Sequence, residues 1–178
     1  LGVFTFSEIG GRLRVHSEQG IETLGPVSLR IPRLGEERLR LTGRYGGFSA
    51  DSPYALEFAL DRFRLPEPAG DGRLEKEIGH VWRLFYPEGE AGIRGRYFSR
   101  NGGEGRLTAT LELLGASGRF HAFPYPVDNV RGIVQLTDER VESFDARGHR
   151  GPTEVRVYGQ ADYRLGHPYD VTVEISSG

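Results

Sequence analysis

The chain has 178 residues, enough for one domain with a buried core, and 37% of them are hydrophobic. Its formal net charge is -2, so no overall positive charge attracts nucleic acid. It contains no cysteine, which excludes disulfides, thiolate metal ligands and cysteine nucleophiles, and no stretch approaches the roughly 18 apolar residues of a membrane helix.

Alternation of apolar and polar residues, the period of a strand with one buried face, dominates the chain. In chain order it appears in VSLRI (27–31), RLRLTGRY (38–45), YALEFAL (54–60), GRLTATLEL (105–113), EVRVYGQADY (154–163) and YDVTVEI (169–175). Central strands of a parallel sheet would instead be continuously apolar. The pattern therefore predicts a mainly β protein with antiparallel strands and turns at 46–48, 101–105, 136–140 and 164–168.

One segment has a helical period instead. In GDGRLEKEIGHVWRLFYPEG (70–89), the apolar residues Leu74, Ile78, Val81, Trp82 and Phe85 recur at helical spacing. Asp71 is a candidate N-cap, and Pro87 follows as a stop signal. We expect one short amphipathic helix over 72–85 that covers one end of the sheet.

The chain also resembles itself. EIGGRLRVHSEQGIETL (8–24) is similar to NVRGIVQLTDERVESF (129–144), RLTGRYG (40–46) to RVYGQAD (156–162), and SPYALEFAL (52–60) to HPYDVTVEI (167–175). We interpret these similarities as an internal repeat, 4–60 and 125–175, joined by a helix-containing connection at 66–90. The chain lacks methionine and opens and closes within strand-like patterns, so we expect 1–178 to be one segment of a longer repeating protein.

The stretch RFHAFPYPVDNVRGIVQL (119–136) places aromatic residues and prolines before a strand. Because Pro124 and Pro126 cannot donate to a strand ladder, they belong at a strand start or an exposed edge. We interpret the stretch as the entry to the second repeat, packed on the helix that carries Trp82. The alternative is a lip that contacts a ligand.

The order of VWRLFYPEGEAGIRGRY, GRLTATLELLGASGRF, FPYPVDNVRG and DARGHRGPTEVRVYG resembles the AsmA/TamB-like superfamily of bacterial envelope proteins. The resemblance is best over 74–163 and weaker over 1–65. It implies an elongated, curled β-groove with an apolar concave face that conducts phospholipid across the periplasm, from a parent chain anchored in the inner membrane. It also implies no catalysis and no cofactor. The expected partners are phospholipid acyl chains, neighbouring repeats of the parent chain and membrane proteins at its ends, with no nucleic acid.

The alternating strands supply the candidate groove residues, which are Leu39, Leu41, Leu56, Phe58, Leu107, Leu111, Val134, Leu136, Val155, Val157, Val171 and Val173. A closed β-sandwich would bury the same residues as its core, so the alternation alone leaves both folds open. With the resemblance, we favour the open groove.

Other chemistries find little support. The histidines (His16, His80, His121, His149 and His167) have no metal-ligand spacing and suggest exposed turns, and we expect no metal site. There is no GxSxG nucleophile elbow and no phosphate-binding loop in the required context. The acids, and the arginine rows Arg12, Arg14, Arg38, Arg40 and Arg44, indicate a solvated face with weak cross-strand pairs.

Two alternatives to lipid transport remain. The first is a binding module of a secreted or cell-surface protein, which would gather Tyr86, Tyr97, Tyr125 and Tyr169 on one patch to recognise carbohydrate or protein. The second is a structural spacer in which the repeats provide length only.

Overall fold

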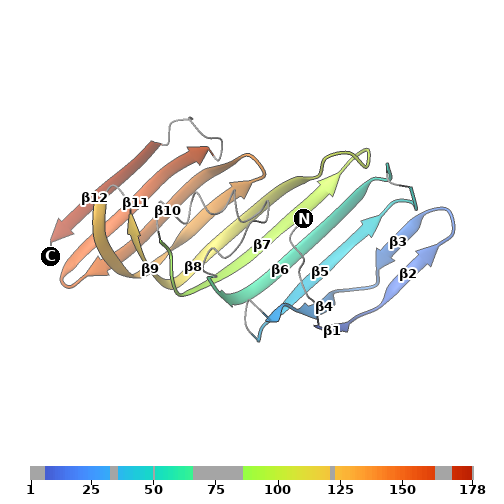
Figure 1. Cartoon of the computed structure of the whole chain (residues 1–178), viewed down its shortest axis with the longest axis horizontal. Coiled ribbons are helices and arrows are strands. Elements are labelled where there is room, and N and C mark those ends of the chain that lie inside the picture. The colour runs from blue at the N-terminus through green and yellow to red at the C-terminus, as the bar shows by residue number, and fades with distance from the viewer. Residues whose placement is uncertain are drawn as a thin grey trace.

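The computed structural model describes residues 7–32, 36–49, 51–65, 86–120, 123–162 and 170–177. These residues form one antiparallel sheet of twelve strands. The strands are β1 (Ser7–Gly10), β2 (Leu13–His16), β3 (Gly20–Thr23), β4 (Val27–Arg30), β5 (Arg38–Tyr45), β6 (Tyr54–Arg64), β7 (Glu90–Ser99), β8 (Arg106–Phe120), β9 (Phe123–Thr137), β10 (Arg140–Arg150), β11 (Thr153–Asp162) and β12 (Asp170–Ser177). Figure 1 shows them side by side in a single elongated layer.

The sheet is open. From β4 to β12 each strand pairs with the next one in sequence, and β1 and β2 lie beside β4 and β3 at the other end. Within the described residues, β1 with β2 and β12 are the outer strands, and these two edges do not meet. The prediction of a mainly β, antiparallel, open sheet is therefore confirmed, and the closed-sandwich alternative is wrong.

The predicted turns fall between strands at 46–53, 100–105 and 138–139. The predicted turn at 164–168 and the predicted helix over 72–85 lie outside the described residues. The proline-containing stretch lies at the start of β9, where Pro126 pairs with Arg119 of β8.

The two halves of the chain pair their strands in equivalent registers. In the first half Gly10 pairs with Ser28 and Ser7 with Arg30; in the second Arg131 pairs with Arg147 and Asp128 with His149. These pairs are related by constant offsets of 121 residues (131 − 10 and 128 − 7) and 119 residues (147 − 28 and 149 − 30).

Backbone geometry shows the same correspondence. Glu8 and Asn129, at equivalent ladder positions, both have left-handed backbone, with φ of 52° and 51°. Further on, Gly43 pairs with Leu56 as Gly159 pairs with Val171. Strands β1 and β2 together thus occupy the place of β9, β3 and β4 that of β10, β5 that of β11, and β6 that of β12.

The core is two clusters on one side of the sheet. Leu65, Ala91 and Ala116 form the first cluster, near the start of β7. Val141, Phe144 and Ala161 form the second, on β10 and β11. No described strand packs across either cluster from a second layer.

Candidate functional site

One face of the sheet is apolar across nine strands. Residues directly opposite each other in an antiparallel ladder point to the same face. The register places one unbroken row on that face: Val27, Leu41, Phe58, Gly95, Ala109, Leu136, Val141 and Ala161. A second row runs through Ile93, Leu111, Val134, Phe144, Gly159 and Val171. We call this surface the apolar face.

All twelve predicted groove residues lie on the apolar face. Leu39 and Leu41 come from β5, Leu56 and Phe58 from β6, and the others from β8, β9, β11 and β12. Most of these side chains are half-buried, Val155 is buried and Leu56 is exposed. Within the described part of the chain, no further strand covers the face.

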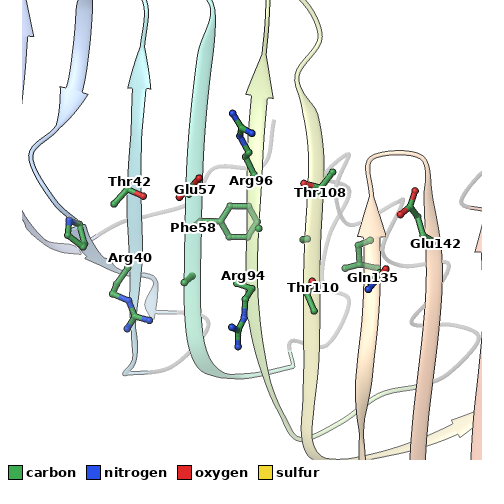
Figure 2. Close-up of a pocket in the computed structure, with 15 residues that line it drawn as sticks. Arg40, Thr42, Glu57, Phe58, Arg94, Arg96, Thr108, Thr110, Gln135 and Glu142 are labelled. Carbon is green, nitrogen blue, oxygen red and sulfur yellow. The ribbon is translucent and has the colours of Figure 1, made fainter.

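The packing of the apolar face needs one close approach of backbone. A Cβ added to Gly95 of β7 would lie 2.6 Å from Cζ of Phe58 and 2.5 Å from the carbonyl oxygen of Thr108. Glycine at this position lets the Phe58 ring of β6 lie across β7, as Figure 2 shows. The ring thereby closes the gap between the leucines of β5 and those of β8.

The opposite face is polar and rich in ion pairs, and we call it the polar face. Arg40 donates to Asp61 from Nη1 and Nη2, at 2.7 and 2.8 Å, and Arg156 donates to Asp145 from Nε and Nη2, at 3.0 and 2.7 Å. Hydrogen bonds from these arginines hold the pKa values of Asp61 and Asp145 below their usual range. All four side chains are open to solvent, which screens their charges, so each pair contributes little to the stability of the fold.

A hollow of about 580 Å³ lies on the polar face (Figure 2). Two rows of directly paired residues line it, Thr42–Glu57–Arg96–Thr108 and Arg40–Ala59–Arg94–Thr110–Gln135. Sequence reasoning did not find this hollow, because its lining residues are scattered over separate strands. The resemblance implies an apolar concave face, whereas this hollow has a mixed lining, in which Pro26, Phe58, Ala109 and Leu136 lie among charged and hydroxyl side chains.

Three tyrosines line one rim of the apolar face. The rings of Tyr45 and Tyr54 stack with centroids 6.2 Å apart, and Tyr97 packs at 5.4 Å from Tyr54. The hydroxyl of Tyr45 donates to the carbonyl oxygen of Ser49 at 2.8 Å. The three lie where β5 and β7 end and β6 begins. We call this set the tyrosine rim.

The hydroxyl of Tyr97, together with partial burial, raises the pKa of Tyr54 to about 12. Replacing Tyr97 with phenylalanine is expected to bring the pKa of Tyr54 back toward its ordinary value near 10, because the hydrogen bond is lost. Tyrosinate absorbance followed against pH measures this shift. Because the folded-state pKa is the higher one, the contribution of Tyr54 to stability is complete below pH 10 and is lost as the pH rises toward 12. An unchanged titration curve in the variant would contradict this pairing.

The other predicted features are dispersed. His16 lies in β2, 3.4 Å from Glu22, and His149 lies in β10, so these two are strand residues and the expectation of turns is wrong for them. His80, His121 and His167 lie outside the described residues. The described residues contain no group of three side chains that could hold a metal ion.

The tyrosines of the binding-module alternative are not seen to form one patch. Tyr97 belongs to the tyrosine rim, while Tyr86 lies under the guanidinium of Arg119, 5.1 Å from its ring centroid. The side chains of Tyr125 and Tyr169 are outside the described set. Of the arginine rows, Arg14 pairs with Glu22 at 3.2 Å and Arg38 with Glu8 at 2.6 Å.

Comparison with known proteins adds no family. No protein-family model matches the chain, and no match is found among curated proteins or solved structures. Among the described residues, no helix has the length and hydropathy needed to cross a membrane.

Proposed function

We propose that this sheet holds phospholipid acyl chains against its apolar face and lets them pass along it, without catalysis or a cofactor. The observation that carries the proposal is the unbroken apolar surface from β4 to β12, with the polar face behind it. A continuous apolar surface that no described strand covers marks an interaction site. Acyl chains fit it because they need continuous apolar contact and no specific hydrogen bonds.

The tyrosine rim gives a place for the lipid headgroup. Tyrosine combines an apolar ring with a hydroxyl that stays in water, the combination favoured at lipid–water boundaries. Arg44 and Arg106 lie at the same strand ends but on the polar face, whereas Arg100 lies in the turn after β7 and makes no ion pair within the described structure. Of the three, Arg100 is placed to attract a phosphate group at the rim, even though Asp51 and Glu104 lie in the adjoining turns.

The proposed setting is the periplasm of a diderm envelope, between the inner and outer membranes. Movement of lipid along the face can be passive, because lipid that slides along an apolar surface with its headgroup in water breaks no strong contact at any step. The spacer alternative predicts the same sheet with no lipid on it, so it is an outcome of the tests below.

The proposal is tested with single cysteines carrying an environment-sensitive fluorophore. The natural chain has no cysteine, so only the introduced thiol reacts. Val134→Cys places the probe on the apolar face and Ile133→Cys places it on the adjacent residue of the polar face. Both substitutions remove an aliphatic side chain of similar size. Ile133 is 51% exposed, so a probe at this position reports on the polar face without disturbing buried packing.

Dihexanoyl phosphatidylcholine below its micelle concentration supplies monomeric phospholipid as the ligand. The expected result is a saturable blue shift of the probe at position 134 and no shift at position 133. A similar response at both positions, or none at either, would contradict the proposed function.

A further inference from the structure

The two outer edges of the sheet expose apolar side chains. On the β1–β2 edge, Ile9, Leu13 and Val15 are 67%, 58% and 65% exposed, and on the β12 edge Ile175 is 55% exposed. Within the described structure neither edge has a neighbouring strand on its outer side. Unpaired edges with exposed apolar residues are templates for strand addition.

The β8–β9 pair inside the sheet shows which kind of strand fits the β1–β2 edge. Strand β9 is the register equivalent of β1 and β2, and its outer side is paired with β8. There Leu136, Val134 and Gly132 lie opposite Ala109, Leu111 and Leu113. The equivalent residues on the free edge, at the offset of 121, are Val15, Leu13 and Gly11. Because β8 covers them, Val134 and Leu136 are half-buried where Leu13 and Val15 are exposed.

Strand β12 of a second copy can lie beside β1 and β2 in the same way that β8 lies beside β9. Since the strands alternate in direction along the sheet, β8 and β12 run the same way, and each would be antiparallel to its new neighbour. Val171, Val173 and Ile175 then lie opposite Val15, Leu13 and Gly11. The large Ile175 faces a glycine, as Leu113 faces Gly132 in the interior pair. Translation along the sheet keeps the two apolar faces on the same side.

This register also pairs opposite charges on the polar face. Glu174 lies opposite Arg12, and Asp170 lies opposite His16. Arg12 forms no ion pair within the described structure. One carboxylate oxygen of Glu174 lies 3.5 Å from Arg156, and the other accepts a hydrogen bond from the hydroxyl of Tyr158. Apolar contact on one face and charge pairing on the other select this register over a shift by one residue, which would place apolar side chains opposite charged ones.

We propose that two copies of this chain associate head to tail, with β12 of one copy added to the β1–β2 edge of the next. The interface is heterologous, because the two partners use different edges, so it leaves a free edge at each end for further copies. The apolar faces then join into one longer surface. This inference rests on the edges and their register, and it stands whether or not the apolar face holds lipid.

Disulfide trapping tests the register. In the β8–β9 pair, the carbonyl oxygen of Leu107 accepts from the backbone N–H of Asp138, so apolar-face residues form the hydrogen-bonded pairs. Polar-face residues form the closer, non-hydrogen-bonded pairs, whose Cα separation near 4.5 Å suits a disulfide. Arg14 and Thr172 are such a pair in the proposed junction.

The expected result is a disulfide-linked dimer when Arg14→Cys and Thr172→Cys chains are mixed and oxidised. The off-register mixture of Arg14→Cys with Ser176→Cys is the control and should remain largely unlinked. Equal linking in both mixtures, or a dominant Arg14→Cys homodimer, would overturn the proposed junction.

Charge reversal supplies a second, independent readout by sedimentation of the natural chain and its variants. Arg12→Glu and Glu174→Arg should each weaken association by about 5- to 30-fold, since each places like charges opposite one another. Mixing the two variants should restore it, because every junction then regains an opposite pair. A natural chain that sediments as a monomer at all concentrations, or a mixture no tighter than its components, would overturn the inference.

Discussion

Replacing Leu111 with aspartate is expected to weaken binding of short-chain phospholipid at least about tenfold, because a carboxylate on the apolar face loses its hydration when an acyl chain covers it. Leu111 lies near the centre of the face, between Ile93 of β7 and Val134 of β9. The matched control is Ile133→Asp, which places the same charge on the polar face. Calorimetric titration of both variants with dihexanoyl phosphatidylcholine gives the comparison.

Val157→Asp repeats the test on β11, three strands from Leu111 on β8, and should have the same effect if the whole face binds lipid. Circular dichroism of each variant establishes that the sheet remains folded. A folded Leu111→Asp chain that binds phospholipid as tightly as the natural chain would show that the apolar face is not the binding surface.

Replacing Phe144 with alanine is expected to lower the free energy of unfolding by about 3 kcal/mol. Phe144 is only 8% exposed, and it packs with Val141 and Ala161 in the core cluster on β10 and β11. The alanine variant loses the apolar contacts that the ring makes in this cluster, and the neighbouring side chains replace them only in part. Urea denaturation measures the loss.

Phe48→Ala is the control for the Phe144 prediction. Phe48 is 61% exposed in the turn between β5 and β6, and its loss should change stability by no more than about 0.5 kcal/mol. Equal losses in the two variants would mean that the cluster on β10 and β11 does not carry the stability assigned to it.

Alternation was sufficient to predict the apolar face because the sheet is a single layer and its side-chain period is two. Every candidate from Leu39 to Val173 therefore lies on one side. Strand β7 was not predicted from alternation, since its apolar face carries Ala91 and Gly95, which give a weak hydrophobic signal. Alternation also could not distinguish an open sheet from a closed one, because both bury one face.

Interruptions at the N-terminal edge were also beyond sequence reasoning. The strand equivalent to β9 is split into β1 and β2 around Gly11, where φ is 150°, and the next is split into β3 and β4 around Gly25, where φ is 98°. The sequence similarity of the two halves does not show these breaks. Nor does it show the hollow on the polar face, which depends on strand pairs such as Thr42 with Glu57 and Thr108 with Arg96.

The central claim, that the apolar face holds phospholipid, is tested most directly by native mass spectrometry and lipid extraction of the natural chain purified without detergent from the periplasm of a diderm bacterium. We expect phospholipid bound to the folded chain. A folded chain that carries no lipid, and takes none from added phospholipid, would show that the apolar face does not hold phospholipid and would favour a structural spacer.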